Sequence, residues 1–102
     1  MHRLAFISQP MKGKTEERIR KERQDLVERL MEMGYDVIDS VFGDFPESED
    51  DVKCIPLAYL GKSLALMAKC DGIAFAPGWA NARGCKIEHD CAVAYGIPIL
   101  IE

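Results

Sequence analysis

The stretch that decides the fold is DGIAFAPGWANARGCKIEHDCAVAYGIPILI, residues 71–101. It begins with Asp71 and an apolar run at residues 72–76, passes through a loop of small residues, and shows helical spacing over about residues 83–95. Gly96 follows as a helix stop, and residues 97–101 form a second apolar run. Because neither run alternates with polar residues, both indicate parallel strands that are covered on both faces.

Upstream of this stretch the same pattern of strand and helix occurs. Residues 4–8 form a short apolar run, and Thr15 is placed to cap a following helix that ends at Gly34. Residues 35–39 are the next predicted strand, and a second helix is predicted over residues 57–69. The apolar positions that define the two helices are Ile19, Leu26, Leu30 and Met33 in the first and Leu60, Leu64 and Met67 in the second. Between them, residues 40–53 are acidic and irregular and are predicted to form a loop.

Strands that alternate with helices in this way predict an α/β fold, a flavodoxin-like or Rossmann-like three-layer sandwich. We expect a four-stranded parallel sheet in the order 2-1-3-4, with helices on both faces. Ligands of such sheets bind beyond the carboxyl ends of the strands, near the point where the strand order reverses. The loops at residues 9–15 and 77–84 are therefore predicted to meet around a binding crevice.

The composition limits the classes of partner. The chain has 102 residues, of which 48% are hydrophobic and 29% charged, as expected for a single domain over residues 1–102. Its net charge of -4 argues against binding a nucleic acid polymer or an anionic membrane, because such binding needs clustered Lys and Arg. No apolar run approaches the roughly 20 residues that cross a bilayer, and no signal-peptide pattern is seen. We expect a cytoplasmic protein that binds a small molecule or another protein.

The four cysteines show no C-x-x-C pair, so neither a zinc ribbon nor a thioredoxin motif is indicated. We expect no metal and no cofactor. Free, mostly buried thiols are the simplest reading. The alternative is a reactive Cys85, since the first turn of a helix lowers the pKa of a thiol.

The first loop, SQPMKGKT, combines turn residues with positive charge. Pro10 and Gly13 shape the turn, while Lys12, Lys14 and the free amides of the following helix suit a phosphate or carboxylate. An ordinary turn with solvated lysines is the alternative. In the second loop, Trp79 is predicted either to stack on a ligand ring or to close the edge of the core.

Glu88 is the least expected residue of the third helix. At helical spacing it shares a side with Cys91, Ala92 and Tyr95, while His89 is expected to face solvent. A carboxylate without a partner is unfavourable on a packing face, because desolvation raises its pKa or destabilises its surroundings. Glu88 therefore either pairs with a buried donor or lines a cavity.

The segments FISQPMKGKT, CDGIAFAPGWANARGCKIEHDCA and GIPIL resemble the nucleoside 2-deoxyribosyltransferase-like superfamily, and most closely the DUF4406 family. This resemblance implies that Glu88 occupies the position of a glutamate that attacks the anomeric carbon of a deoxyribosyl unit. It also implies a dimer or larger homo-oligomer. Three partner positions depart from the superfamily pattern: Phe6 stands in place of a tyrosine, Ser63 in place of an aspartate, and Ala82 in place of a polar residue. Tyr35, Tyr59 and Asp71 are the alternative candidates for these partner roles.

The sequence is compatible with three functions. The first is binding of a nucleoside, nucleotide or related phosphorylated molecule without turnover. The second is an N-glycosidase or deoxyribosyltransferase with Glu88 as nucleophile, and the third is an oligomeric interaction protein without a ligand. The residues predicted to contact the ligand, besides Glu88, are Phe6, Ser8, Gln9, Pro10, Met11, Gly13, Lys14, Ser63, Pro77, Gly78, Trp79, Asn81, Ala82, Arg83 and Gly84.

Overall fold

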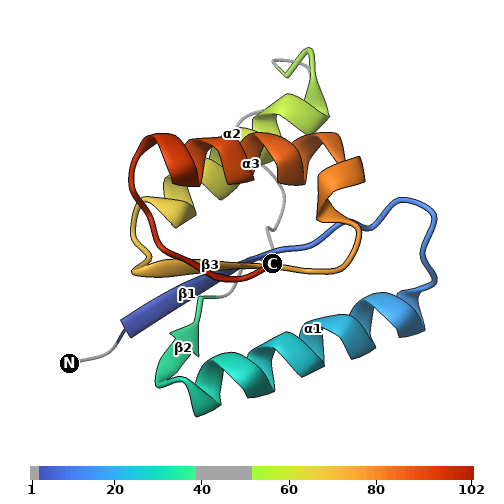
Figure 1. The fold of residues 1–102 in the computed structure, drawn as a ribbon. Coiled ribbons are helices and arrows are strands. Elements are labelled where there is room, and N and C mark those ends of the chain that lie inside the picture. The colour runs from blue at the N-terminus through green and yellow to red at the C-terminus, as the bar shows by residue number, and fades with distance from the viewer. Residues whose placement is uncertain (1–2, 39–51) are drawn as a thin grey trace.

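The structure, a computed structural model, describes residues 3–38 and 52–102 (Figure 1). The predicted acidic loop at residues 40–53 lies almost entirely outside these ranges. The described part of the chain runs strand, helix, strand, helix, strand, helix, strand, as the sequence predicts.

The sheet contains four parallel strands in the predicted order β2-β1-β3-β4. β1 (Arg3–Ser8) begins one residue before the run that predicts it, whereas the other three strands are shorter than their predicted runs: β2 (Tyr35–Val37), β3 (Gly72–Phe75) and β4 (Ile99–Ile101). β1 and β3 pair in the middle, and their last residues, Ser8 and Phe75, are register partners. The carboxyl ends of the two central strands therefore meet at one edge of the sheet.

Within the described residues, three α-helices connect the strands, namely α1 (Glu16–Glu32), α2 (Ile55–Met67) and α3 (Arg83–Ala94). The Thr15 hydroxyl accepts a hydrogen bond from the Arg18 amide at 3.1 Å, which confirms Thr15 as the cap of α1. α2 begins two residues earlier than predicted, because Pro56 is tolerated in a first helical turn, where its missing N–H is not needed.

The helices cover both faces of the sheet. Figure 1 shows α1 on one face and α2 and α3 on the other. Successive residues of β1 point to opposite faces, so Ala5 and Ile7 pack with Leu26 and Leu30 of α1. The second cluster, on the face of α2 and α3, consists of Phe6, Met67, Ile73, Phe75 and Ala92. The alternation along β1 therefore directs Ser8, two residues after Phe6, toward α3.

Some predicted core positions are exposed. Met33, on the predicted apolar side of the first helix, is 47% exposed because it caps α1 instead of continuing its regular turn. Tyr95, predicted to share the side of Glu88, is 82% exposed, because α3 ends at Ala94 and Tyr95 is its C-cap residue. All four cysteines carry free thiols, but only Cys85 is buried, so the expectation of mostly buried thiols is wrong.

The helices of the described residues are unsuited to crossing a membrane, being too short or too polar for a bilayer span.

Candidate functional site

The candidate site lies where β1 ends against α3. Ser8, the last residue of β1, is 1% exposed, and Glu88, in the second turn of α3, is 7% exposed. The Ser8 hydroxyl donates a hydrogen bond of 3.1 Å to Glu88 Oε1. Two residues that are 80 positions apart in the sequence thus meet at the carboxyl edge of the sheet. Of the two explanations for a carboxylate on this helix face, the structure supplies the buried donor.

Burial determines the acidity of Glu88. Loss of water raises the pKa of the carboxyl group from 4.5 to about 7, and the hydrogen bond from Ser8 lowers it only partly toward its usual range. Among the described residues, no cation contributes to this balance. A carboxylate has room for about four hydrogen bonds, so one hydroxyl leaves most of its accepting capacity unused. Perturbed carboxyl groups of this kind are typical of functional sites.

Cys85 belongs to the same cluster. It lies in the first turn of α3, is 5% exposed, and its thiol is influenced by the nearby Ser8 hydroxyl. Burial raises the pKa of the Cys85 thiol, and the Glu88 charge adds to this effect, while the Ser8 hydrogen bond and Lys14 oppose it. The predicted alternative of a thiol activated by the helix terminus is therefore wrong, because desolvation outweighs the stabilising contributions.

Lys14 joins the two loops that were predicted to meet. Its ammonium donates to the carbonyl oxygen of Pro77 at 2.7 Å and to Glu22 of α1 at 3.0 Å. The Lys14 and Glu22 side chains are only 9% and 14% exposed, so this ion pair is largely shielded from water. Arg18 adds a second contact to Glu22 at 3.1 Å. The positive charge of Lys14 is therefore engaged with groups of the protein and is not presented freely to an anion.

Other residues of the first loop also hold the loops in place. The Gln9 amide donates to the Ile19 carbonyl at 2.6 Å and so attaches the loop to α1. Pro10 is buried, and its Cγ lies 3.8 Å from the place that a Cβ would take on Gly78. Gly78 has a φ of +87°, in the left-handed region that favours glycine. Gly13 has a φ of +80° in the turn before α1, and Met11 is 61% exposed.

Trp79 begins a short 3-10 turn, η2 (Trp79–Asn81), and its indole is stacked on the imidazole of His89. The ring centroids are 4.2 Å apart and the planes differ by 16°. Phe75, at the end of β3, contacts both rings, at 5.3 Å from Trp79 and 5.1 Å from His89. The His89 side chain is 19% exposed, so its predicted place on the solvent face is wrong. The η2 turn lies over the side of α3 that carries His89 and covers this residue.

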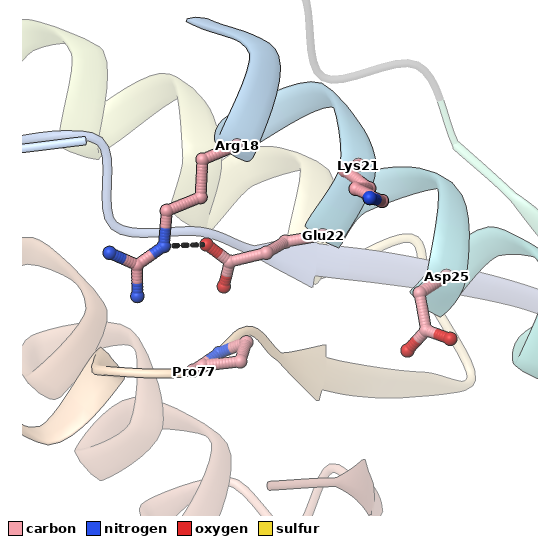
Figure 2. A pocket seen from close by; sticks show the side chains of 5 residues that line it. All are labelled: Arg18, Lys21, Glu22, Asp25 and Pro77. Carbon is pink, nitrogen blue, oxygen red and sulfur yellow. Dashed lines mark hydrogen bonds and ion pairs between the residues drawn. The ribbon is translucent and has the colours of Figure 1, made fainter. Parts of the chain in front are cut away.

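A hollow of about 250 Å³ opens on the other side of this loop. Figure 2 shows its lining residues, with Arg18, Lys21, Glu22 and Asp25 on α1 and Pro77 on the chain opposite this helix. The lining carries both signs of charge, and Glu22 is already paired with Arg18 and Lys14. Glu88 lies on the opposite face of the sheet and does not line this hollow. The Glu88 cluster and this hollow are therefore separate features of the molecule.

Several predicted residues do not join Glu88. Phe6 is buried in the core beneath α2 and α3, with 2% of its surface exposed. Ser63 lies half-buried on α2, and no hydrogen bond between Ser63 and Glu88 is found among the described residues. Asp71 accepts from the Leu4 amide at 2.8 Å, and Tyr35 is the register partner of Arg3. Asp71 and Tyr35 thus lie at the amino edge of the sheet, where neither can substitute for a missing partner.

The remaining predicted residues surround the start of α3. Asn81 and Arg83 are exposed, while Ala82 and Gly84 are half-buried. Ala82 is the N-cap residue of α3, and no side chain of the described part of the chain caps this helix. The first amide groups of α3 therefore receive no capping hydrogen bond from Ala82, and they lie at the positive end of the helix dipole.

Four residues that shape the site were not among the predicted site residues, namely Glu22, Phe75, His89 and Glu102. His89 Nε2 lies 3.0 Å from Glu102 Oε2, immediately after β4. The pairing of Lys14 with Pro77 spans 63 positions. Such contacts depend on how the loops fold over the sheet, and local periodicity carries no signal for them. The i,i+4 spacing of Arg18 and Glu22 was the only visible sign of the cluster around Lys14.

No group of three or more potential metal ligands occurs within residues 3–38 and 52–102. Comparison with known proteins gives one match: the model of the family DUF4406, described as a domain of unknown function, matches residues 4–101. No curated protein and no solved structure gives a significant match. The family match extends from β1 to β4 and so includes both halves of the candidate site.

Proposed function

The chain belongs to the DUF4406 family, and on that premise we propose that it binds a nucleoside, a nucleotide or a related phosphorylated small molecule at the carboxyl edge of its sheet. The observation that carries this proposal is the buried Glu88 carboxyl group, which has one side-chain donor among the described residues, Ser8, and unused accepting capacity. Hydroxyl groups of a sugar are donors that suit such a carboxylate.

Two neighbouring features support this class of ligand. Trp79 is partly exposed and offers an aromatic surface on which a flat ring stacks. The start of α3 offers amide groups for a phosphate or another anion, and the exposed Lys12 adds positive charge to the first loop. Lys14 contributes differently from the sequence-based expectation, because it fixes Pro77 in place.

Cleavage of the bond between base and sugar is the second candidate. It is supported by the place of Glu88 at the carboxyl edge and by the resemblance to deoxyribosyltransferases, in which this position holds the nucleophile. Retaining glycosidases use a second carboxyl group about 5 Å from the nucleophile to assist the leaving group. Among the described residues, Ser8 and Cys85 are the polar neighbours of Glu88, and neither is a good proton donor for a departing base. Binding without turnover is therefore the first proposal.

A thermal-shift screen against nucleosides, deoxynucleosides and their monophosphates tests both candidates when it is combined with chromatography for released base. Stabilisation of the protein without free base supports a binding protein. Base release that disappears in Glu88→Gln supports the glycosidase instead. If no compound in the panel stabilises the protein or is cleaved, both candidates are wrong.

We further propose that the chain forms a dimer or a larger homo-oligomer, as the resemblance implies. α2 is the most apolar helix, yet Ile55, Leu57 and Tyr59 are 46%, 64% and 37% exposed. Light scattering of the purified protein measures the assembly directly. A molar mass at least twice that of one chain is expected, and a monomer at working concentrations would contradict the proposal.

A further inference from the structure

The indole of Trp79 is held by contacts that the proposed function does not by itself explain. Stacked aromatic rings stabilise each other beyond the area that they bury, and Trp79, His89 and Phe75 form a continuous group of three rings. They come from three elements: η2, α3 and β3. The position of the loop residue is thus set by a helix and a strand.

His89 is itself fixed at its edge. A carboxylate only accepts hydrogen bonds, so Nε2 of His89 carries the proton that is donated to Glu102 Oε2 at 3.0 Å. This bond fixes the tautomer and the orientation of the imidazole plane. Asp90 lies farther away, at 3.9 Å from Nδ1, and is 72% exposed. Glu102 is therefore the stronger of the two acidic partners of the ring.

From these contacts we propose that His89 is a positioning residue for Trp79, and that Glu102 orients His89. One face of the indole is occupied by the imidazole, so a ligand with a flat ring stacks on the opposite face and extends the group of rings. Glu102, which follows β4, is in this way linked through the His89 imidazole to the loop that carries Trp79. The ligand part of this inference rests on the proposed function, whereas the positioning of Trp79 does not.

Tryptophan fluorescence tests the positioning directly, because Trp79 is the only tryptophan of the chain. His89→Ala is expected to raise the population of undocked indole about two- to tenfold, the equivalent of one lost aromatic pair. The readouts are a shift of the emission spectrum and stronger quenching by acrylamide. His89→Phe keeps a ring on the indole and is expected to stay close to the parent protein.

Glu102→Ala and Asp90→Ala form a matched pair, since each removes one carboxylate near His89. Glu102→Ala is expected to change emission in the same direction as His89→Ala, to a smaller extent, and Asp90→Ala is expected to leave it unchanged. Circular dichroism checks the folding of each variant. If His89→Ala does not fold, Glu102→Ala carries the test. Parent-like emission and quenching in the folded variants would overturn the assignment, and equal effects of the two carboxylate variants would overturn the role of Glu102.

Binding of a nucleotide that the thermal-shift screen identifies gives the second readout. His89→Ala is expected to weaken its affinity about two- to tenfold, while His89→Phe retains it. An affinity that is unchanged in a variant with altered emission would overturn the stacking of the ligand on Trp79. If the parent protein binds no nucleotide, the proposed function and the stacking of the ligand both fail, and the fluorescence result still decides whether His89 positions Trp79.

Discussion

At the scale of single residues, Glu88 has the environment that differs most from that of an ordinary carboxylate. Its helix position places it against the end of β1, where Ser8 is the last residue and is almost fully buried. The cost of removing its charge from water is only partly offset by one neutral hydroxyl, so the protonated form is favoured. A ligand that donates hydrogen bonds to Glu88 would favour the ionised form again.

The raised pKa of Glu88 predicts a specific pH dependence of stability. Below pH 4.5 the group is protonated in both the folded and the unfolded chain, and it contributes no difference. As the pH rises toward the folded pKa of about 7, the unfolded chain ionises first, so stability is lost. Over this window the unfolding free energy of the parent protein should fall relative to Glu88→Gln by about 3 kcal/mol, and it should not change further at higher pH.

Urea unfolding of both proteins between pH 4 and pH 8 measures this difference, because contributions from other groups cancel. Glu32→Gln, which changes an exposed glutamate in the same way, is the control and should show a constant offset from the parent protein. A constant offset for Glu88→Gln as well would mean that Glu88 ionises at an ordinary pH in the folded protein.

At the scale of elements, the site depends on how two loops are held together. Lys14 connects the loop after β1 to α1 through Glu22 and to the loop after β3 through Pro77. The Lys14 and Glu22 side chains are largely shielded from water, so loss of their ion pair leaves a charged group poorly solvated, whereas the bond to Pro77 is exposed. The loops on the two sides of the switch point therefore form one unit.

Lys14→Met keeps most of the side-chain volume and removes the ammonium. It is expected to lower the unfolding free energy by about 2 kcal/mol, as for a lost hydrogen bond to a charged group. Glu22 keeps its contact with Arg18, which limits the loss. Chemical denaturation measures the effect, with Lys12→Met as the control at an exposed lysine of the same loop. Equal stabilities of the two variants would show that Lys14 is only a solvated charge.

The contact between β3 and β4 is equally specific. A Cβ added at Gly72 would lie 2.5 Å from Leu100 Cδ1, so Gly72→Ala forces the Leu100 side chain to move. We expect a loss of about 1–3 kcal/mol, as for other overpacked cores. Gly61→Ala is the matched control, because nothing lies within 4 Å of its added methyl group in α2, and it is expected to stabilise the helix slightly. Equal midpoints of thermal unfolding for the two variants would contradict this packing.

At the scale of the whole molecule, the sequence predicts the fold well and the site only in part. The apolar runs of β1 and β3 and the helical spacing of α3 are local patterns, so the strand order and the place of Glu88 at the carboxyl edge could be inferred from them. Ser8 was among the predicted site residues. That Ser8 is the partner of Glu88, however, depends on how β1 and α3 pack together, which the sequence does not show.

The errors have a common physical cause. His89 was expected in solvent because helix geometry alone places it away from the core, but η2 folds over that side of α3 and stacks Trp79 on it. Lys14 was predicted either to attract an anion or to be solvated, but it is engaged by Glu22 and Pro77, which lie on other elements. Contacts of this kind arise from the meeting of loops that are distant in the sequence, and no local period encodes them.

The central claim is that the Glu88 carboxyl group contacts a nucleoside or nucleotide. Isothermal titration calorimetry with the best compound of the nucleotide panel, performed on the parent protein, Glu88→Gln and the exposed control Glu32→Gln, tests it most directly. We predict that Glu88→Gln weakens binding about ten- to hundredfold, as expected for the loss of a charge-assisted hydrogen bond, and that Glu32→Gln binds like the parent protein. Equal affinity of all three proteins, or no binding by the parent protein, would contradict the claim.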